Sequence, residues 1–187
     1  GLRDYALKAN GGRVARQLTS GNRGFLASRD DDPSVAIDDD VHAGRCWSFS
    51  LLPCQLGIRL PHMLYPSHVT VEHIPKSLVA DIGQAPRNMT LWGVVDGRGN
   101  TEIFERLMVS GLPGSGQQTP PIARDLLWAP LASFSYDIDD NNPVQTFPVS
   151  SPMVGSGMMF GVVAIEVLDN WGSDTTCLYR VRIHGRP

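Results

Sequence analysis

Apolar residues in this chain form short runs that turn residues interrupt, and long stretches of helical period are missing. The runs predict β-strands at Cys46–Leu51, Leu56–Leu60, His68–His73, Thr90–Val95, Ile103–Val109, Ser133–Tyr136, Val144–Val149, Gly161–Val167 and Cys177–His184. Several of these runs alternate between apolar and polar positions. Val69, Val71 and His73 share one face of their strand, and Tyr179, Val181 and Ile183 share one face of another. Many short strands at this spacing predict an all-β fold, a compact jelly-roll-like β-sandwich with one or two short helices.

The expected helices are an opening turn over Asp4–Asn10, which Gly11-Gly12 ends, and a second near Ile122–Leu127. Polar loops are expected at Thr19–Ser34, Gly111–Pro121 and Asp137–Pro143. No internal repeat is visible, and 187 residues suit one domain over residues 1–187.

Composition narrows the class of protein. Hydrophobic residues make up 42%, enough for a core, and the net charge of −3 is spread along the chain without a basic stripe. Nucleic acid is therefore not an expected partner. The longest uncharged apolar run, near Gly157–Val163, is too short to span a membrane. We expect an excised domain whose targeting or membrane segments lie outside this chain.

Signatures of enzymes and metal sites do not emerge. Gly155-Ser156-Gly157 lacks the spacing of a nucleophile elbow or a dinucleotide loop, and indicates a glycine-rich turn before a strand. The odd spacing of His68 and His73 puts them on opposite faces of a strand. The Asp137–Asn141 run lacks the glycine and glutamate of a calcium loop. We expect no enzymatic activity.

Cys46, Cys54 and Cys177 contain no C-x-x-C pair, which disfavours structural zinc. The residues leave open one disulfide with a free thiol or three buried thiols, and composition alone favours the thiols. Asn88-Met89-Thr90 is an acceptor triplet for glycosylation, although such triplets also arise by chance.

Four blocks, in this order, resemble the SUN domain of LINC-complex proteins of the inner nuclear membrane. They are Asp4-Tyr5-Ala6-Leu7 with Gly11-Gly12-Arg13-Val14; Asp40-Val41-His42-Ala43-Gly44-Arg45-Cys46-Trp47-Ser48-Phe49; Val69-Thr70-Val71-Glu72-His73-Ile74-Pro75-Lys76 with Ala85-Pro86-Arg87 and Leu91-Trp92-Gly93; and Asn170-Trp171-Gly172 with Cys177-Leu178-Tyr179-Arg180-Val181-Arg182-Ile183-His184-Gly185. With Gln145-Thr146-Phe147, they span nearly the whole chain. Residues 111–127 look like an insertion relative to this family.

The resemblance implies a non-enzymatic bridging module in the perinuclear space of the nuclear envelope. Such domains follow a membrane span and a coiled coil, usually trimerise, and bind the C-terminal tail of KASH proteins of the outer nuclear membrane. The pair transmits force from the cytoskeleton and so positions the nucleus. Membrane contact is then expected only through segments outside this chain.

The resemblance also implies three site features. Cys46 and Cys177 match the family's disulfide, which a lumenal compartment permits, while Cys54 has no counterpart. Residues 35–46 match a cation loop whose backbone carbonyls cage potassium or sodium, carried over to Val35, Asp38, Asp40, Arg45 and Tyr179. An ordinary Asx-rich turn is the alternative. The tail carboxylate is expected at Tyr179, with His73, Gln84 and Thr175 around it, unless Tyr179 is simply a core aromatic residue.

The main departure lies in residues 17–34, where many family members carry an apolar β-hairpin, the KASH lid, that adds the tail as a strand. Here Gly21, Gly24, Asp30–Asp32 and Pro33 predict a reduced or missing lid. One alternative is therefore a lid-less SUN domain that binds KASH tails weakly and is monomeric as this fragment. Another is a carbohydrate-binding sandwich that uses Trp47, Trp92, Trp128 and Trp171.

Overall fold

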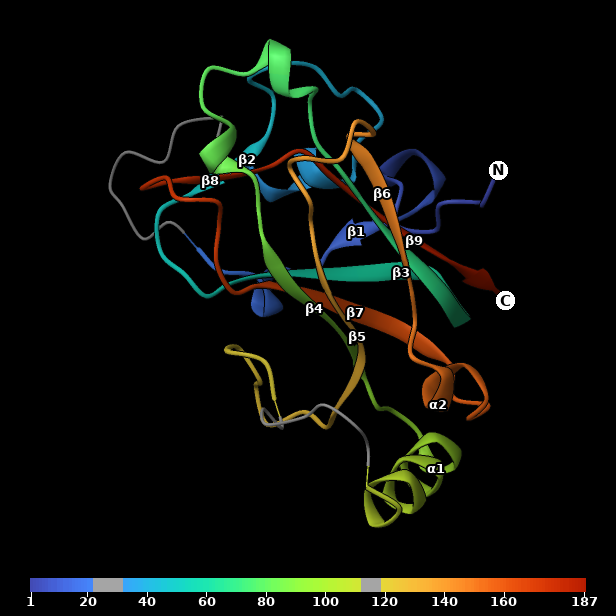
Figure 1. The fold of residues 1–187 in the computed structure, drawn as a ribbon. Coiled ribbons are helices and arrows are strands. Elements are labelled where there is room, and N and C mark those ends of the chain that lie inside the picture. The colour runs from blue at the N-terminus through green and yellow to red at the C-terminus, as the bar shows by residue number, and fades with distance from the viewer. Residues whose placement is uncertain (22–31, 112–118) are drawn as a thin grey trace.

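The computed structural model describes residues 1–21, 32–111 and 119–187 (Figure 1). Its strands are β1 (Arg13–Val14), β2 (Trp47–Phe49), β3 (Cys54–Glu72), β4 (Asn88–Val94), β5 (Trp128–Ser135), β6 (Val144–Pro148), β7 (Phe160–Val167), β8 (Thr176–Leu178) and β9 (Arg180–Arg186). The helices are α1 (Arg98–Val109) and α2 (Ser151–Val154), with 3₁₀ turns at Lys8–Asn10, Arg16–Leu18, Pro33–Ile37, Lys76–Leu78 and Ile82–Gln84. The predicted all-β sandwich is confirmed.

Strand β3 belongs to both layers of the sandwich. Its first part pairs antiparallel with β1 and β7, in the order β1-β3-β7-β4-β5, and its second part pairs with β6 and β9. The register shifts between Arg59 and Leu64 and again between Pro66 and His68. Pro61 and Pro66 lie at these shifts, and proline has no N–H for the ladder. Two predicted strands, Leu56–Leu60 and His68–His73, are therefore parts of one bent strand.

The core lies between the layers and uses the predicted alternation. Val69 and Val71 of β3 and Val181 and Ile183 of β9 are completely buried. On the opposite face of β9, Arg180 and His184 are buried and Arg182 is partly exposed, and the N-terminal residues pack alongside this strand. Ile183 accepts a backbone hydrogen bond from Tyr5 at 2.9 Å. The two termini consequently lie on the same side of the molecule (Figure 1).

The strand predicted at Ile103–Val109 is wrong, since these residues form the second half of α1. Phe104 is buried, and Ile103 and Leu107 pack partly buried against the core. Leu107 lies three residues after Phe104 and four after Ile103, which is the spacing of a helix face. The strand prediction rested on this apolar run alone. The polar residues before it, Arg98–Glu102, form the start of the helix.

The helix predicted near Ile122–Leu127 is also wrong. The buried Gln55 side chain accepts from the Ile122 N–H at 2.9 Å and donates to its carbonyl at 3.0 Å, which removes Ile122 from any helix. Arg124 and Asp125 follow with left-handed φ values of 52° and 57°. The short helix α2 lies elsewhere, and the opening turn is limited to the 3₁₀ turn Lys8–Asn10, which ends at Gly11 as predicted.

Two predictions fall partly outside the described residues. The reduced lid, residues 17–34, includes 22–31, and the insertion, residues 111–127, includes 112–118. On the described side of the lid region, Leu18 is buried beneath Gly57, and Pro33–Ile37 forms a 3₁₀ turn that leads into the 35–46 loop.

Candidate functional site

A small ladder carries the disulfide. Strands β2 and β8 pair antiparallel, with Trp47 opposite Leu178 and Ser48 opposite Cys177. Cys46 and Cys177 are bonded, with their Cα atoms 5.5 Å apart and a sequence separation of 131. The implied pairing is confirmed. Cys54 is a buried free thiol in the core, and burial raises its pKa to about 11.

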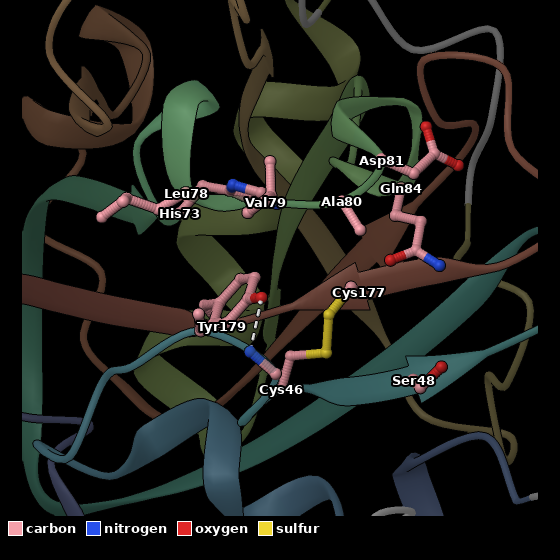
Figure 2. Close-up of a pocket in the computed structure, with 12 residues that line it drawn as sticks. Cys46, Ser48, His73, Leu78, Val79, Ala80, Asp81, Gln84, Cys177 and Tyr179 are labelled. Carbon is pink, nitrogen blue, oxygen red and sulfur yellow. Dashed lines mark hydrogen bonds between the residues drawn. A yellow bond between two sulfur atoms is a disulfide. The ribbon is translucent and has the colours of Figure 1, made fainter.

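A pocket of about 490 Å³ lies against this disulfide (Figure 2). Strands β2 and β8 lie at the end of the molecule away from α1 (Figure 1). Figure 2 shows the Leu78–Asp81 segment along one side, with the disulfide and Ser48 on the other. The residues that line the pocket are Ala43, Gly44, Cys46, Ser48, His73, Leu78, Val79, Ala80, Asp81, Gln84, Cys177 and Tyr179. They come from four separate parts of the sequence, which only the folded chain brings together.

His73 and Tyr179 form the buried floor of this pocket. Their rings meet edge to face, with centroids 4.8 Å apart. The His73 Nδ1 lies 2.9 Å from the Ile74 carbonyl and must donate to it, because a carbonyl only accepts. Burial lowers the pKa of His73, so the ring is neutral at pH 7 and Nε2 is an acceptor. Among the described residues, this buried Nε2 has no hydrogen-bond partner.

Gln84 and Thr175 meet at the rim. The Gln84 side-chain amide donates to the Thr175 hydroxyl at 2.9 Å. Asn170 holds the turn before Thr175, because its side-chain amide donates to the Ser173 carbonyl at 2.9 Å and to the Thr176 hydroxyl at 3.0 Å. Of the four predicted peptide-binding residues, His73, Gln84 and Tyr179 line one pocket, and Thr175 contacts it through Gln84. Their binding roles stay predictions.

The 35–46 loop contacts the pocket through Gly44, whose N–H donates to the Tyr179 hydroxyl at 3.1 Å. Within the loop, Arg45 donates to the Asp40 carbonyl at 2.8 Å and to the Asp38 carboxylate at 3.0 Å. The bond from Arg45 lowers the pKa of Asp38. The Val35 carbonyl accepts from the Asp38 N–H at 3.3 Å. Loop and tyrosine are thus neighbours, as the resemblance implies.

The Asp40 carbonyl, one of the five predicted cation ligands, already accepts an N–H from the Arg45 guanidinium, which places a positive charge beside the predicted cation site. Bound potassium or sodium stays a prediction. Within the described ranges, no cluster of three His, Cys, Asp or Glu residues could hold a metal ion.

Asn88, the glycosylation candidate, is exposed at the start of β4. Its side chain donates a hydrogen bond to Asp169 at 2.9 Å, and its modification also stays a prediction.

Sequence reasoning missed part of the pocket. The Leu78–Asp81 wall starts at the last residue of the 3₁₀ turn Lys76–Leu78 and ends just before the turn Ile82–Gln84, and it has no sequence pattern of its own. The only available signal was its position between the recognised blocks that end at Lys76 and begin at Ala85. Leu78 is 66% exposed, so its side chain presents apolar surface beside the pocket.

The fold and site define the chain as a disulfide-braced β-sandwich with a ligand-sized pocket at one end. The Sad1/UNC-like C-terminal family model matches residues 26–110 and 105–187, so the chain belongs to this family, the SUN domains. The most similar relatives include SUN domain-containing protein 2 of Mus musculus, 29% identical, and SUN domain-containing protein 1 of Homo sapiens, 28% identical; each alignment covers all of this chain. Klaroid protein of Drosophila melanogaster is 28% identical over the same extent.

The chain spans only 23%, 22% and 18% of these three relatives. No helix in the described part of the chain is long and apolar enough to cross a bilayer.

Solved structures support the sandwich fold. The family 32 carbohydrate-binding module of Streptococcus pneumoniae EndoD matches with a TM-score of 0.60 and 10% identity, over 98% of this chain and all of that one. The family 32 module of C. perfringens NanJ, in complex with galactose, matches with a TM-score of 0.53 and 13% identity, over 92% of this chain and 98% of that one. At such identity the likeness shows the fold alone.

Proposed function

We propose that this domain is a non-enzymatic bridging module of the nuclear envelope, which binds the C-terminal tail of a KASH-type protein in the pocket beside the disulfide. One observation carries the proposal. His73, Gln84 and Tyr179, which are far apart in sequence, line a single pocket of about 490 Å³ against the Cys46–Cys177 bond. The relatives are SUN domain proteins, in agreement with this role.

The pocket offers the groups that a peptide terminus requires. The Tyr179 hydroxyl accepts from Gly44 and keeps its own hydrogen for a carboxylate. Gln84 uses one amide hydrogen on Thr175 and has a second for a ligand. His73 packs edge to face against Tyr179 and so supports that ring in the floor of the pocket. Hydrogen bonds to a charged group contribute about 1.5–3 kcal/mol each, so a free terminal carboxylate is the favoured ligand.

The wall of the pocket suits apolar side chains of the tail. Leu78, Val79 and Ala80 present aliphatic surface, and Leu78 is 66% exposed. Burial of a leucine side chain contributes about 1.5–3 kcal/mol. Polar capture of the terminus and apolar contact along the wall together select a hydrophobic tail that ends in a carboxylate.

The proposed compartment is the perinuclear space, since a structural disulfide persists in an oxidising lumen. Trimer formation and membrane attachment are assigned to segments of the whole protein, of which this chain is one part. As an isolated fragment with a reduced lid, the domain is expected to be monomeric and to bind tails more weakly than a lidded relative.

Sugar binding is the weaker reading. Trp47, Trp92 and Trp128 are between 1% and 3% exposed, so none can stack on a sugar ring. Trp171 is half-buried, and the Arg87 guanidinium already lies 4.2 Å from its ring centroid. The stacking surface that this hypothesis requires is therefore absent among the four tryptophans.

The proposal is tested by fluorescence anisotropy with a labelled KASH tail peptide and the variant Leu78→Ser. We expect about a tenfold loss of affinity, since an exposed wall residue contributes to binding and little to folding. Leu51→Ser is the matched control, because Leu51 is 81% exposed and does not line the pocket. Equal affinity of both variants and the wild type would show that the tail binds elsewhere.

A further inference from the structure

The Arg45 side chain makes several contacts within the 35–46 loop. Its Nη1 donates to the Asp40 carbonyl at 2.8 Å, its Nη2 to the Asp38 carboxylate at 3.0 Å, and its Nε lies 3.8 Å from the Asp40 carboxylate. Only 28% of the Arg45 side chain is exposed, against 62% for Asp40. All three guanidinium nitrogens are thus directed at oxygens of one turn, and a planar fork suits this task where a point charge does not.

These contacts bear on any second cation in the loop. An ion bound by the Asp40 carbonyl would lie within a few ångströms of the guanidinium. Two unit charges about 4 Å apart repel by about 4 kcal/mol at the effective dielectric constant of a protein surface, ~20. The loop does carry Asp38, Asp39 and Asp40, but Asp39 and Asp40 are exposed, and water screens their attraction. Asp38 is 25% exposed and already pairs with the Arg45 guanidinium at 3.0 Å.

The position of Arg45 in sequence connects it to the pocket. It directly follows Gly44, whose N–H donates to the Tyr179 hydroxyl at 3.1 Å, and directly precedes Cys46 of the disulfide. The Arg45 N–H also closes the turn on the His42 carbonyl at 3.0 Å. Anchoring the guanidinium therefore fixes the backbone on both sides of Arg45. This backbone includes Gly44 and Cys46, which both line the pocket.

We infer that Arg45 is the internal cation of this loop: its guanidinium holds the Asp38–Arg45 turn against Tyr179, so that loop order requires no bound potassium or sodium. Arg45 is then a positioning residue for the pocket. The inference depends on the loop geometry alone and holds whether or not the pocket binds a KASH tail.

The first test uses the wild-type domain, dialysed free of alkali cations and returned to equal ionic strength with potassium, sodium or N-methyl-D-glucamine chloride. Thermal unfolding is followed by circular dichroism. We expect the same melting temperature in all three salts. A saturable rise in melting temperature that is specific to potassium or sodium would overturn the inference.

The second test measures positioning by the ¹H–¹⁵N NMR signal of Gly44. In Arg45→Asn we expect this signal to shift or broaden and the melting temperature to fall. Arg98→Asn makes the same charge change on a side chain that is 94% exposed, and is expected to leave the Gly44 signal unchanged. A wild-type Gly44 signal and melting temperature in Arg45→Asn would overturn the inference, and if that variant does not fold the wild-type salt series decides alone.

Discussion

The guanidinium of Arg180 lies 3.1 Å from the carboxylate of Asp4, although the sequence separation of the two residues is 176. Both side chains are buried, at 11% and 8% exposure. The second oxygen of Asp4 accepts from the Ala6 and Ile183 N–H groups at 2.9 and 3.2 Å. This contact joins the N-terminal residues to β9 at Arg180, the residue after Tyr179. The floor of the pocket therefore depends on both ends of the chain.

Breaking that pair should be costly. Arg180→Ala leaves Asp4 buried beside an empty space, and removing one partner of a buried ion pair costs about 3–5 kcal/mol. We expect a loss of this size in the free energy of unfolding, measured by denaturant titration. Arg98→Ala, on an exposed helix pair with Glu102, should change it by less than about 0.5 kcal/mol. Similar values for the two variants would contradict the account.

The disulfide should stabilise the domain through the long loop it closes. Closing a loop of the 131-residue separation corresponds to about 4–5 kcal/mol in the chain-entropy model. The double variant Cys46→Ser, Cys177→Ser should therefore unfold at markedly lower denaturant, and wild type in reductant should match it. Cys54→Ala is the control: it should retain the cross-link in non-reducing mass mapping. Detection of alkylated Cys46 and Cys177 before reduction would refute the pairing.

Gly93 in β4 should not tolerate a side chain. A Cβ atom there would lie 2.5 Å from a ring carbon of Phe160, a completely packed core residue. We expect Gly93→Ala to destabilise by about 1–3 kcal/mol through overpacking. Gly99→Ala in α1 meets no atom within 4 Å and should stabilise by up to about 1 kcal/mol. The same sign of change in both variants, read from melting temperatures, would argue against this packing.

Stability should fall as the pH drops below about 6.5 because of His184. Burial lowers its folded-state pKa, while Nδ1 donates to the Arg3 carbonyl at 2.8 Å and Nε2 accepts from the Thr70 hydroxyl at 2.7 Å. The unfolded chain then binds more protons, so stability is present above the ordinary pKa and lost below it.

Unfolding free energies at pH 7.5, 6.5 and 5.5 measure this loss. His184→Asn should flatten the profile, although His73 shares the same direction of shift. The exposed His62→Asn should keep the wild-type profile. A profile that is flat in the wild type would contradict the assignment of a buried neutral His184.

Sequence reasoning reached the β-sandwich because alternation in β3 and β9 reports which face meets the core. It also reached Cys46, Cys177 and Tyr179, but only through the resemblance, since spacing cannot pair cysteines. It failed at α1, where Ile103, Phe104 and Leu107 are too few to separate helix from strand. It could not find the Asp4–Arg180 pair, because charge complementarity over 176 residues leaves no local pattern.

The pocket wall at Leu78–Asp81 could not be predicted from the sequence either. Its residues have no periodicity, and their exposure follows only from how the Lys76–Gln84 segment is laid over the disulfide. Tertiary contacts of this kind depend on the assembled fold, whereas strand faces depend on neighbours in sequence.

The most direct measurement of the central claim compares two forms of one KASH tail peptide, with a free C-terminal carboxylate or with a C-terminal amide, by fluorescence anisotropy on the wild-type domain. If the terminus is held by Tyr179 and Gln84, loss of its charge should weaken binding at least about tenfold, equivalent to ~1.4 kcal/mol. Equal affinity for both peptides, or no binding of either, would contradict the proposed role of the pocket.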